Sequence, residues 1–382
     1  MQKRIRIVSV GIVLVILLIG IIVINNNSNS KYSFTQDGIK YALTLDGNKI
    51  TSFPSKGMYK AQVTCENADG RWLYDDWKLA IENITSDDVT CDIKFETIPK
   101  INLNDYIINL AGSTQGTGQL VNENGYRYEG KNPNNYIWFN NEYWRIIGVF
   151  DSTSHGQSGK NLVKIIRAET LDALAWHKSN TNDWTASSLK SLLNGAYYNA
   201  TDGTSSGYCY GYSTTMTANC DYTKKGIQSG YRGMIANVTW HLGGYSSNSA
   251  TAGSFYGYER GTTVYSGRPT STTGYIGLMY PSDYGYSVLS SSCARTTNLG
   301  SYNTAKCAGA SWLYGKGTEW TLTPRSSNSN FVSVLYSIGY LSSNNANYGY
   351  GSRPVLYLDA SVYKIDGDGS LENPYIVGMW LV

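Results

Sequence analysis

Residues that could carry out catalysis or hold a metal ion are few and widely spaced in this sequence. The three histidines, His155, His177 and His241, belong to no H-x-x-x-H or H-E-x-x-H pattern of the kind that binds zinc on one helix face. The sequence also contains no G-x-S-x-G, Walker or dinucleotide-binding glycine motif. We therefore expect no metal, no cofactor and no catalytic residue.

An acidic, glycine-rich segment near the C-terminus shares its first residues with calcium loops. Residues 366–370 read DGDGS, as at the beginning of an EF-hand loop. The twelfth position is Val377, where an EF-hand needs a glutamate that binds with both oxygens. The segment is therefore predicted to be a turn between the last two strands.

The six cysteines all follow an apolar N-terminal segment, which fits an exported protein. An even number of cysteines in an exported chain indicates disulfides, although sequence alone leaves the pairing open. We expect sequential pairs, because each pair then encloses a short loop rich in turn-forming residues; free buried thiols are the alternative. The cysteines are Cys65, Cys91, Cys209, Cys220, Cys293 and Cys307.

The composition is that of a folded protein with little charge. Of the 382 residues 15% are charged, whereas glycine (40) and tyrosine (33) are abundant. Disordered chains have few aromatic residues and coiled coils are dominated by Ala, Glu, Lys and Leu, so both classes are excluded. The net charge is +3, and Lys3, Arg4 and Arg6 account for it. The remaining chain is neutral and lacks the positive surface of nucleic-acid-binding proteins.

Residues 7–24 form an uncharged apolar run that follows these three basic residues. As a helix the run would be about 27 Å long, close to the hydrocarbon thickness of a bilayer, about 30 Å. We therefore predict one transmembrane helix within residues 1–30, with the N-terminus in the cytoplasm and the rest of the chain extracellular. A cleaved signal peptide is the alternative.

The remaining chain is expected to contain two domains. Residues 31–98 alternate apolar and polar positions and predict a small all-β, sandwich-like domain. Residues 99–133 are rich in Asn, Gly, Thr and Gln and are interpreted as a linker with a short helix at 103–110. The second domain spans 134–377, and 378–382 form a tail.

The second domain combines strand and helix signals. Residues 136–150 predict a hairpin around Asn140 and Asn141, and residues 183–193 predict the clearest helix. Further strands are predicted at 162–166, 319–322, 354–358 and 375–377. Few helices, short strands and long ordered loops indicate an α+β domain.

Three features occur in order: a hairpin that ends in YWRIIGV, a helix after NDW, and the segment EWTLTPRSSNSNFVSVLYSIGYLSSNNANYGYGSRPVLYL. With these features the second domain resembles exported bacterial C-type-lectin-like domains. That class includes formylglycine-generating-enzyme-like domains and the variable proteins of diversity-generating retroelements. Sugar-binding C-type lectins carry EPN or QPD and WND, whereas this chain has ENP and NDW, so calcium-dependent sugar binding is not implied.

The resemblance implies a membrane-anchored surface protein that binds an external protein or glycan through a loop around 325–352. In the variable proteins of diversity-generating retroelements, sequence variation is concentrated in such a loop, so the resemblance also implies a diversified loop. Arg353 and Pro354 are assigned a structural task instead: Arg353 is expected to pair with a carboxylate or a carbonyl beneath the loop. The candidate ligand-binding residues are Arg325, Asn328, Asn330, Phe331, Ser333, Leu335, Tyr336, Ser337, Ile338, Ser342, Ser343, Asn344, Asn345, Asn347, Tyr348, Tyr350 and Ser352.

Two other functions remain open on the sequence. The first is a structural protein of the cell envelope that binds no ligand. The second is a modifying enzyme of the formylglycine-generating class, which would use Cys293 and Cys307 as reactive thiols rather than as a disulfide.

Overall fold

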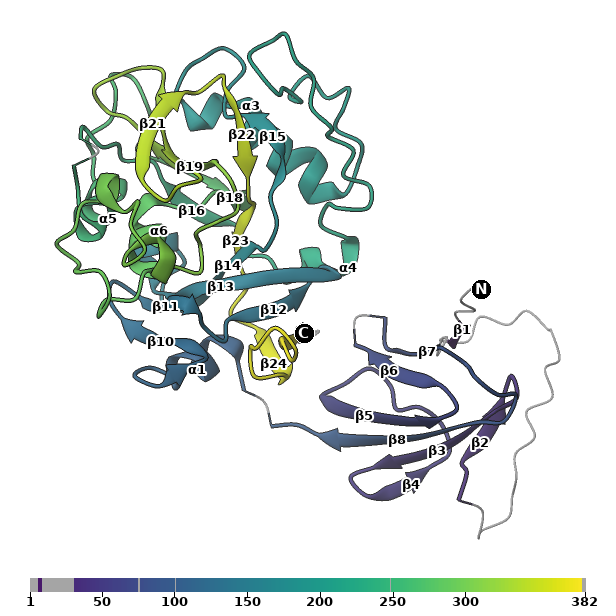
Figure 1. Cartoon of the computed structure of the whole chain (residues 1–382). Coiled ribbons are helices and arrows are strands. Elements are labelled where there is room, and N and C mark those ends of the chain that lie inside the picture. The colour runs from purple at the N-terminus through teal and green to yellow at the C-terminus, as the bar shows by residue number, and fades with distance from the viewer. Residues whose placement is uncertain (1–5, 9–30, 75, 100, 248, 380–382) are drawn as a thin grey trace. The chain divides into compact units, whose positions relative to one another are not determined.

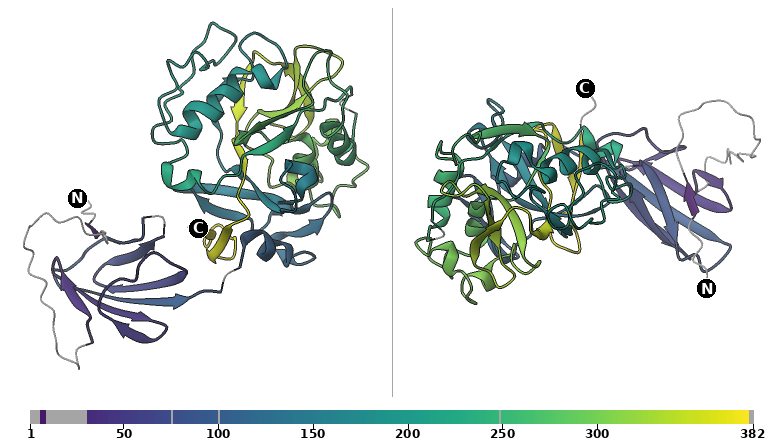
Figure 2. Two further views of the ribbon diagram at one scale, coloured as in Figure 1. Left: turned by 180° about the vertical axis from the view of Figure 1, so that it is seen from behind. Right: turned by 90° about the horizontal axis from the view of Figure 1, so that it is seen from above.

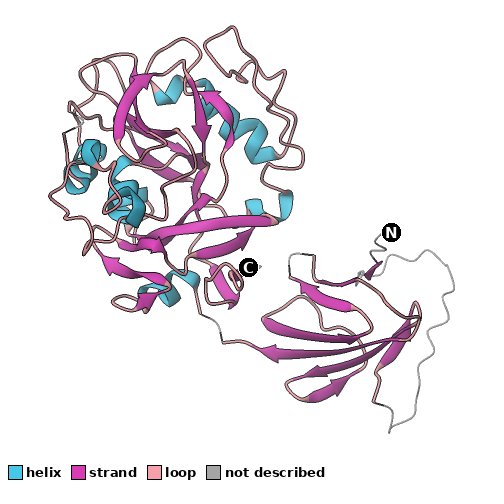
Figure 3. Cartoon of the chain, in the orientation of Figure 1, coloured by secondary structure: helices cyan, strands magenta, loops and turns pink. Residues whose placement is uncertain are grey.

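The computed structural model describes residues 6–8, 31–74, 76–99, 101–247 and 249–379. The chain divides into two compact units, residues 1–100 and 101–382. Strands dominate both units (Figure 3).

Unit 1 consists of strands and turns in its described part (Figure 1). Its larger sheet has the order β2-β3-β8-β5, with β4 beside β3, and β3 runs parallel to β8. Its smaller sheet has the order β1-β7-β6. The strands are β1 (Arg6–Val8), β2 (Phe34–Gln36), β3 (Ile39–Leu45), β4 (Asn48–Ile50), β5 (Tyr59–Glu66), β6 (Asp69–Leu73), β7 (Lys78–Glu82) and β8 (Val89–Thr97).

Aromatic rings fill the core of unit 1. Trp72 packs edge-on against Trp77 and Phe95, with ring centroids 5.2 and 5.0 Å apart. Cys65 of β5 and Cys91 of β8 are direct cross-strand neighbours and form a disulfide. The alternating apolar positions of this segment therefore face one shared interior.

The N-terminal segment differs from its prediction where it is described. Ile7 and Val8 lie in β1, which pairs antiparallel with β7, and not in a helix. Residues 9–30, which would hold most of the predicted transmembrane helix, lie outside the described residues. Among the described residues, no helix is long and apolar enough to span a bilayer.

Unit 2 is built around a ten-stranded sheet. Its main path is β18-β23-β14-β13-β11-β10-β9, and β12 joins β13 to β25, which pairs with β24. The strands are β9 (Thr114–Gln115), β10 (Thr117–Asn122), β11 (Tyr126–Asn132), β12 (Tyr136–Phe139), β13 (Glu142–Phe150), β14 (Leu162–Arg167), β18 (Ile276–Gly277), β23 (Val355–Tyr357), β24 (Val362–Asp366) and β25 (Tyr375–Met379).

A second, five-stranded sheet of unit 2 has the order β15-β22-β19-β20-β21, and β16 and β17 form a separate pair. Figure 2 shows these late strands from two further sides. The strands are β15 (Leu171–Ala175), β16 (Val238–His241), β17 (Ser271–Gly274), β19 (Glu319–Pro324), β20 (Phe331–Leu335), β21 (Leu341–Asn345) and β22 (Gly349–Ser352).

Helices in unit 2 are short. The segment predicted as one helix over 183–193 is divided into a 3-10 turn η1 (Trp184–Ala186), α3 (Ser188–Leu192) and a π-helical turn η2 (Leu193–Tyr197). The other α-helices are α1 (Leu103–Ile108), α2 (Ser152–His155), α4 (Ser229–Arg232), α5 (Ala252–Glu259) and α6 (Pro281–Ser287), and 3-10 turns occur at η3 (Leu299–Ser301) and η4 (Ala308–Ala310).

The predicted α+β class is therefore wrong: the protein is mostly β, with 38% strand and 14% helix. Frequent Gly, Ser and Tyr residues disfavour long helices, because glycine and β-favouring aromatic residues lower helix propensity. The strong hairpin signal at 136–150 is confirmed by β12 and β13, whose turn has Asn140 and Asn141 at φ of 57° and 59°.

Two boundaries also differ from the sequence interpretation. Residues 99–133 are not a linker, because α1, β9, β10 and β11 belong to unit 2. The polar composition of the segment suggested exposure to solvent, but Arg127 and Glu129 are buried, and each has an ion-pair partner. At the other end, β25 continues to Met379, into the segment expected to be a tail.

Candidate functional site

The segment predicted as a ligand-binding loop, 325–352, folds mainly as strands β20, β21 and β22 and their connecting turns. Phe331 of β20 is opposite Asn345 of β21, and the pairing continues to Leu335 and Leu341. Strand pairing explains why this segment is not a loop, since Val332, Val334 and Leu335 of β20 become buried when the segment joins a sheet.

Burial divides the candidate residues into three groups. Ser333, Leu335 and Ser352 are at most 2% exposed and cannot touch a ligand in this structure. Ile338 is 58% exposed, and Ser337 is also exposed. The other candidates are half-buried: Arg325, Asn328, Asn330, Phe331, Tyr336, Ser342, Ser343, Asn344, Asn345, Asn347, Tyr348 and Tyr350.

Five tyrosines form a continuous row of ring contacts, which we call the tyrosine row. Ring centroids are 5.2 Å apart for Tyr212 and Tyr348, 6.4 Å for Tyr348 and Tyr350, and 6.4 Å for Tyr350 and Tyr336. Tyr336 then stacks on Tyr340 at 4.8 Å. The row therefore joins β22 to the turn between β20 and β21.

An amide and a buried indole hold the row from within the sheet. Asn344 Nδ2 donates to the hydroxyl of Tyr350 at 2.6 Å and to that of Tyr336 at 3.3 Å. The ring of Trp320 contacts the ring of Tyr350 edge-on at 5.0 Å. Burial, with its neighbour Tyr336, raises the pKa of Tyr350 to about 12, so this phenol is neutral at physiological pH.

Tyr212 comes from a loop that the sequence analysis did not select. The disulfide Cys209–Cys220 closes this loop. Its backbone is attached to the five-stranded sheet: the amide of Ala175 donates to the carbonyl of Tyr210, and the amide of Ser213 donates to the carbonyl of Asn347, both at 2.7 Å. The sequence feature that could have pointed to Tyr212 is the high tyrosine content of the loop between the predicted disulfide partners Cys209 and Cys220. Tyr340 of the row was also missed.

Asn182 organises the turn between β19 and β20. Its buried side-chain amide lies 2.9, 2.7 and 3.1 Å from the carbonyl oxygens of Arg325, Asn328 and Phe331. Its backbone amide donates to the carbonyl of Ser329 at 2.8 Å. The NDW motif therefore contributes directly to the shape of the candidate site.

Two arginines at the ends of the segment have structural partners. Arg325 donates to the Ser343 hydroxyl at 3.3 Å and to the carbonyl of Ser246 at 3.1 Å. Arg353 is buried, with its Nε 3.0 Å from the carboxylate of Glu319 and its Nη2 3.1 Å from the carbonyl of Leu313. The predicted pairing of Arg353 beneath the segment is confirmed.

The cysteines form three sequential disulfides, Cys65–Cys91, Cys209–Cys220 and Cys293–Cys307, as predicted. Disulfides of this number are consistent with an extracellular protein. Within the described ranges, no group of three or more His, Cys, Asp or Glu side chains is arranged to hold a metal ion.

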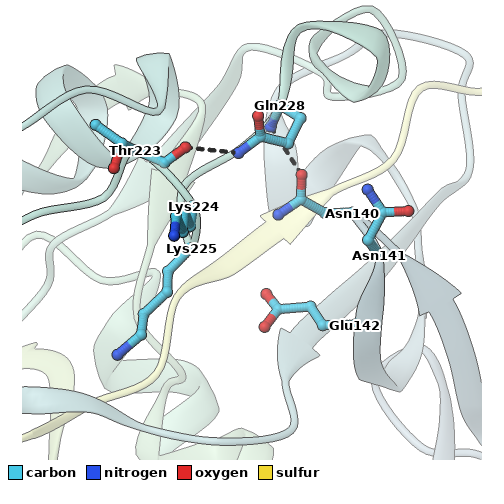
Figure 4. A pocket seen from close by; sticks show the side chains of 7 residues that line it. All are labelled: Asn140, Asn141, Glu142, Thr223, Lys224, Lys225 and Gln228. Carbon is cyan, nitrogen blue, oxygen red and sulfur yellow. Dashed lines mark hydrogen bonds between the residues drawn. The ribbon is translucent and has the colours of Figure 1, made fainter. Parts of the chain in front are cut away.

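A separate pocket of about 350 Å³ lies beside the β12–β13 turn (Figure 4). Its lining residues all carry polar or charged side chains, and it shares no residue with the tyrosine row. It is formed by Asn140, Asn141, Glu142, Thr223, Lys224, Lys225 and Gln228.

Comparison of the chain with protein-family models, with curated proteins and with solved structures found no match in any of the three.

Proposed function

We propose that the protein is an exported binding protein whose tyrosine row contacts an external ligand, a protein or a glycan. The continuous ring contacts from Tyr212 to Tyr340 are the observation that supports this proposal. The three disulfides support a location outside the reducing cytosol.

The chemistry of the row suits recognition better than catalysis. Tyrosine offers a large contact area with few rotatable bonds, and Ser and Asn offer adaptable hydrogen bonds. Tyr212 is 41% exposed and Ile338 is 58% exposed, so both ring and aliphatic surface are available beside the half-buried tyrosines. Because β20, β21 and β22 are hydrogen-bonded strands, the contact residues are held in place before a ligand arrives.

A pair of variants tests this proposal. Tyr212→Ala combined with Tyr348→Ala removes the stacked pair at one end of the row, whereas Tyr208→Ala, 44% exposed in the loop that leads into the same disulfide, is the control. Wild-type protein is screened against a glycan array, an array of extracellular proteins and intact cells. We expect the double variant to bind the selected probe at least about tenfold more weakly, a loss of about 1.4 kcal/mol, and the control to bind normally.

The same screen separates the alternatives. Equal binding by the double variant and the wild type would show that the ligand binds to a surface other than the tyrosine row. Absence of binding to every probe would favour the structural envelope protein. The enzyme alternative receives no support from Cys293 and Cys307, since the two sulfurs are joined in a disulfide.

Variation between copies of the gene gives a second test of the same proposal. If the segment is diversified as in the retroelement relatives, substitutions should collect at codons of partly exposed residues such as Tyr348 and Asn347. They should avoid Ser333, Leu335 and Ser352, which are buried. Deep sequencing of the gene across one cultured population measures this; equal variation at buried and exposed codons would contradict it.

A further inference from the structure

In the pocket beside the β12–β13 turn, the buried side-chain amide of Asn140 connects the turn to the segment that contains Gly226 and Gln228. Asn140 is 5% exposed, its Oδ1 accepts from the backbone amide of Gln228 at 2.8 Å, and its Nδ2 donates to the carbonyl of Gly226 at 3.0 Å. The side chain of Gln228 donates to the carbonyl of Thr223 at 3.3 Å, as Figure 4 shows. The two walls of the pocket are therefore connected without any ligand.

The carboxylate in the pocket is already neutralised. Both oxygens of Glu142 accept from Arg167, at distances of 2.6–3.0 Å. This bidentate pair is a strong, directional contact, so Glu142 does not cancel the charge of another cation in the pocket. Its oxygens can still accept a hydrogen bond from a hydroxyl group.

The two lysines give the pocket an excess of positive charge. Lys224 and Lys225 are both exposed, and neither has an ion-pair or hydrogen-bond partner for its ammonium group among the described residues. One further carboxylate, Asp221, interacts with Lys224: hydrogen bonds from Thr223, with a smaller contribution from Lys224, lower its pKa. Two ammonium groups against this one carboxylate leave a surplus of one positive charge.

Uncharged hydrogen-bonding atoms accompany this charge. The Nδ2 of Asn141 and the Oε1 of Gln228 have no protein partner within the described chain, whereas the other amide atoms of both side chains are engaged. A ligand that satisfies the pocket therefore needs one anionic group and several groups that both donate and accept hydrogen bonds. The lining has no aromatic residue, which disfavours an apolar ligand.

We propose that this pocket binds a small acidic saccharide, a sugar with one carboxylate and several hydroxyl groups. The carboxylate would lie against Lys224 and Lys225, and the hydroxyls would meet Asn141, Gln228 and Glu142. This binding site is separate from the tyrosine row, so it stands or fails independently of the function proposed above.

Two sugars that differ only in the acid group make the test sharp. Saturation-transfer NMR and calorimetry are run on the full chain with glucuronate, with glucose and with inorganic phosphate. We expect glucuronate to bind with a Kd of about 1 mM and glucose and phosphate to give no binding. Binding of glucose as strong as that of glucuronate, or of phosphate alone, would overturn the proposal, as would no binding at all.

Variants locate the site. Lys224→Gln combined with Lys225→Gln should weaken glucuronate binding at least about tenfold, since two charge-assisted contacts are lost. Lys306→Gln, which changes an exposed lysine outside the pocket lining, is the matched control and should leave the affinity unchanged. Because all three lysines are exposed, we expect every variant to fold. Unchanged affinity in the double variant would place the sugar elsewhere and overturn the proposal.

Discussion

At the scale of single residues, the side chains beneath the tyrosine row are buried ions and amides with defined partners. Arg353 and Glu319 are 2% and 1% exposed, and their closest atoms are 2.8 Å apart. An ion pair in such surroundings adds little net stability, but removal of one partner leaves the other charge buried and unpaired.

Arg353→Met should therefore destabilise unit 2 strongly. We expect a loss of about 3–5 kcal/mol in the free energy of unfolding, measured by urea denaturation, because Glu319 stays buried without its guanidinium partner. Adding Glu319→Gln to this variant removes the charge and should recover part of the loss. If the single and the double variant were equally unstable, the unpaired charge would not be the cause.

Asn182 is the second residue that shapes the site from below. Asn182→Ala leaves the carbonyls of Arg325, Asn328 and Phe331 without this donor, so we expect a loss of about 1–3 kcal/mol. Hydrogen exchange should become faster at residues 325–331 in particular. Asn199→Ala, which removes an exposed amide that donates to Gly195, is the control. Equal effects of the two changes would contradict a special role for Asn182.

At the scale of elements, the attachment of the disulfide-closed loop to β22 determines whether the row is continuous. A Cβ atom at Gly349 would lie 2.0 Å from the carbonyl oxygen of Gly211, a backbone atom with no freedom to rotate away. Glycine at this position therefore permits the close approach that places Tyr212 on Tyr348.

Gly349→Ala should push the loop away from the sheet. We expect a loss of about 1–3 kcal/mol from overpacking and faster proteolysis between Cys209 and Cys220, measured on non-reduced protein by mass spectrometry. Gly230→Ala is the matched control, since a Cβ there meets no atom within 4 Å. Unchanged proteolysis in Gly349→Ala would mean that the loop and β22 are not in tight contact.

At the scale of the whole of unit 2, a buried group of charges joins the ten-stranded sheet to α5 and α6. Lys164 of β14 and Arg127 of β11 both contact Asp283 of α6, at 2.5 and 3.0 Å, and all three side chains are 1% exposed. Glu259 of α5 accepts from Ser282 and pairs with Arg260. Burial lowers the pKa of Lys164 to about 8 and raises the pKa of Glu259 to about 7.

The raised pKa of Glu259 predicts a pH dependence of stability. Between pH 4.5, its ordinary pKa, and about pH 7 the folded protein keeps a proton that the unfolded chain has lost. Stability from this group therefore falls as pH rises through that window, by at most about 1.4 kcal/mol per pH unit. The three histidines, of which His155 and His177 are buried and His241 is half-buried, have lowered pKa values and act in the opposite direction. The difference between wild type and Glu259→Gln is therefore the quantity to measure.

Thermal unfolding at pH 5, 6 and 7 measures this difference. We expect the stability of the wild type relative to Glu259→Gln to decrease steadily from pH 5 to pH 7, since only the wild type carries the titrating carboxyl. Asp151→Asn, at an exposed helix cap, is the control. A difference that stayed constant with pH would show that Glu259 has the same pKa in the folded and unfolded chain.

Local patterns in the sequence determined several parts of this protein. The aromatic and β-branched runs on either side of Asn140 and Asn141 in residues 136–150 were enough for the β12–β13 hairpin, because such residues favour strands and asparagine tolerates positive φ. The sequential disulfides agree with the expectation that each pair closes a short turn-rich loop, and Arg353 has the kind of partner expected for it, a carboxylate and a carbonyl. These features depend on neighbours in the chain or on one residue's need for a partner.

Tertiary structure alone decided the rest. Tyr212 and Tyr348 meet because a disulfide-closed loop joins the edge of a sheet, and Lys164 meets Asp283 across 119 residues of chain. The mostly β class likewise arises from strand pairing in segments that the sequence predicted to be loops, such as 325–352. No local pattern encodes such contacts, since they form only when each segment finds a partner that buries its apolar side and satisfies its backbone hydrogen bonds.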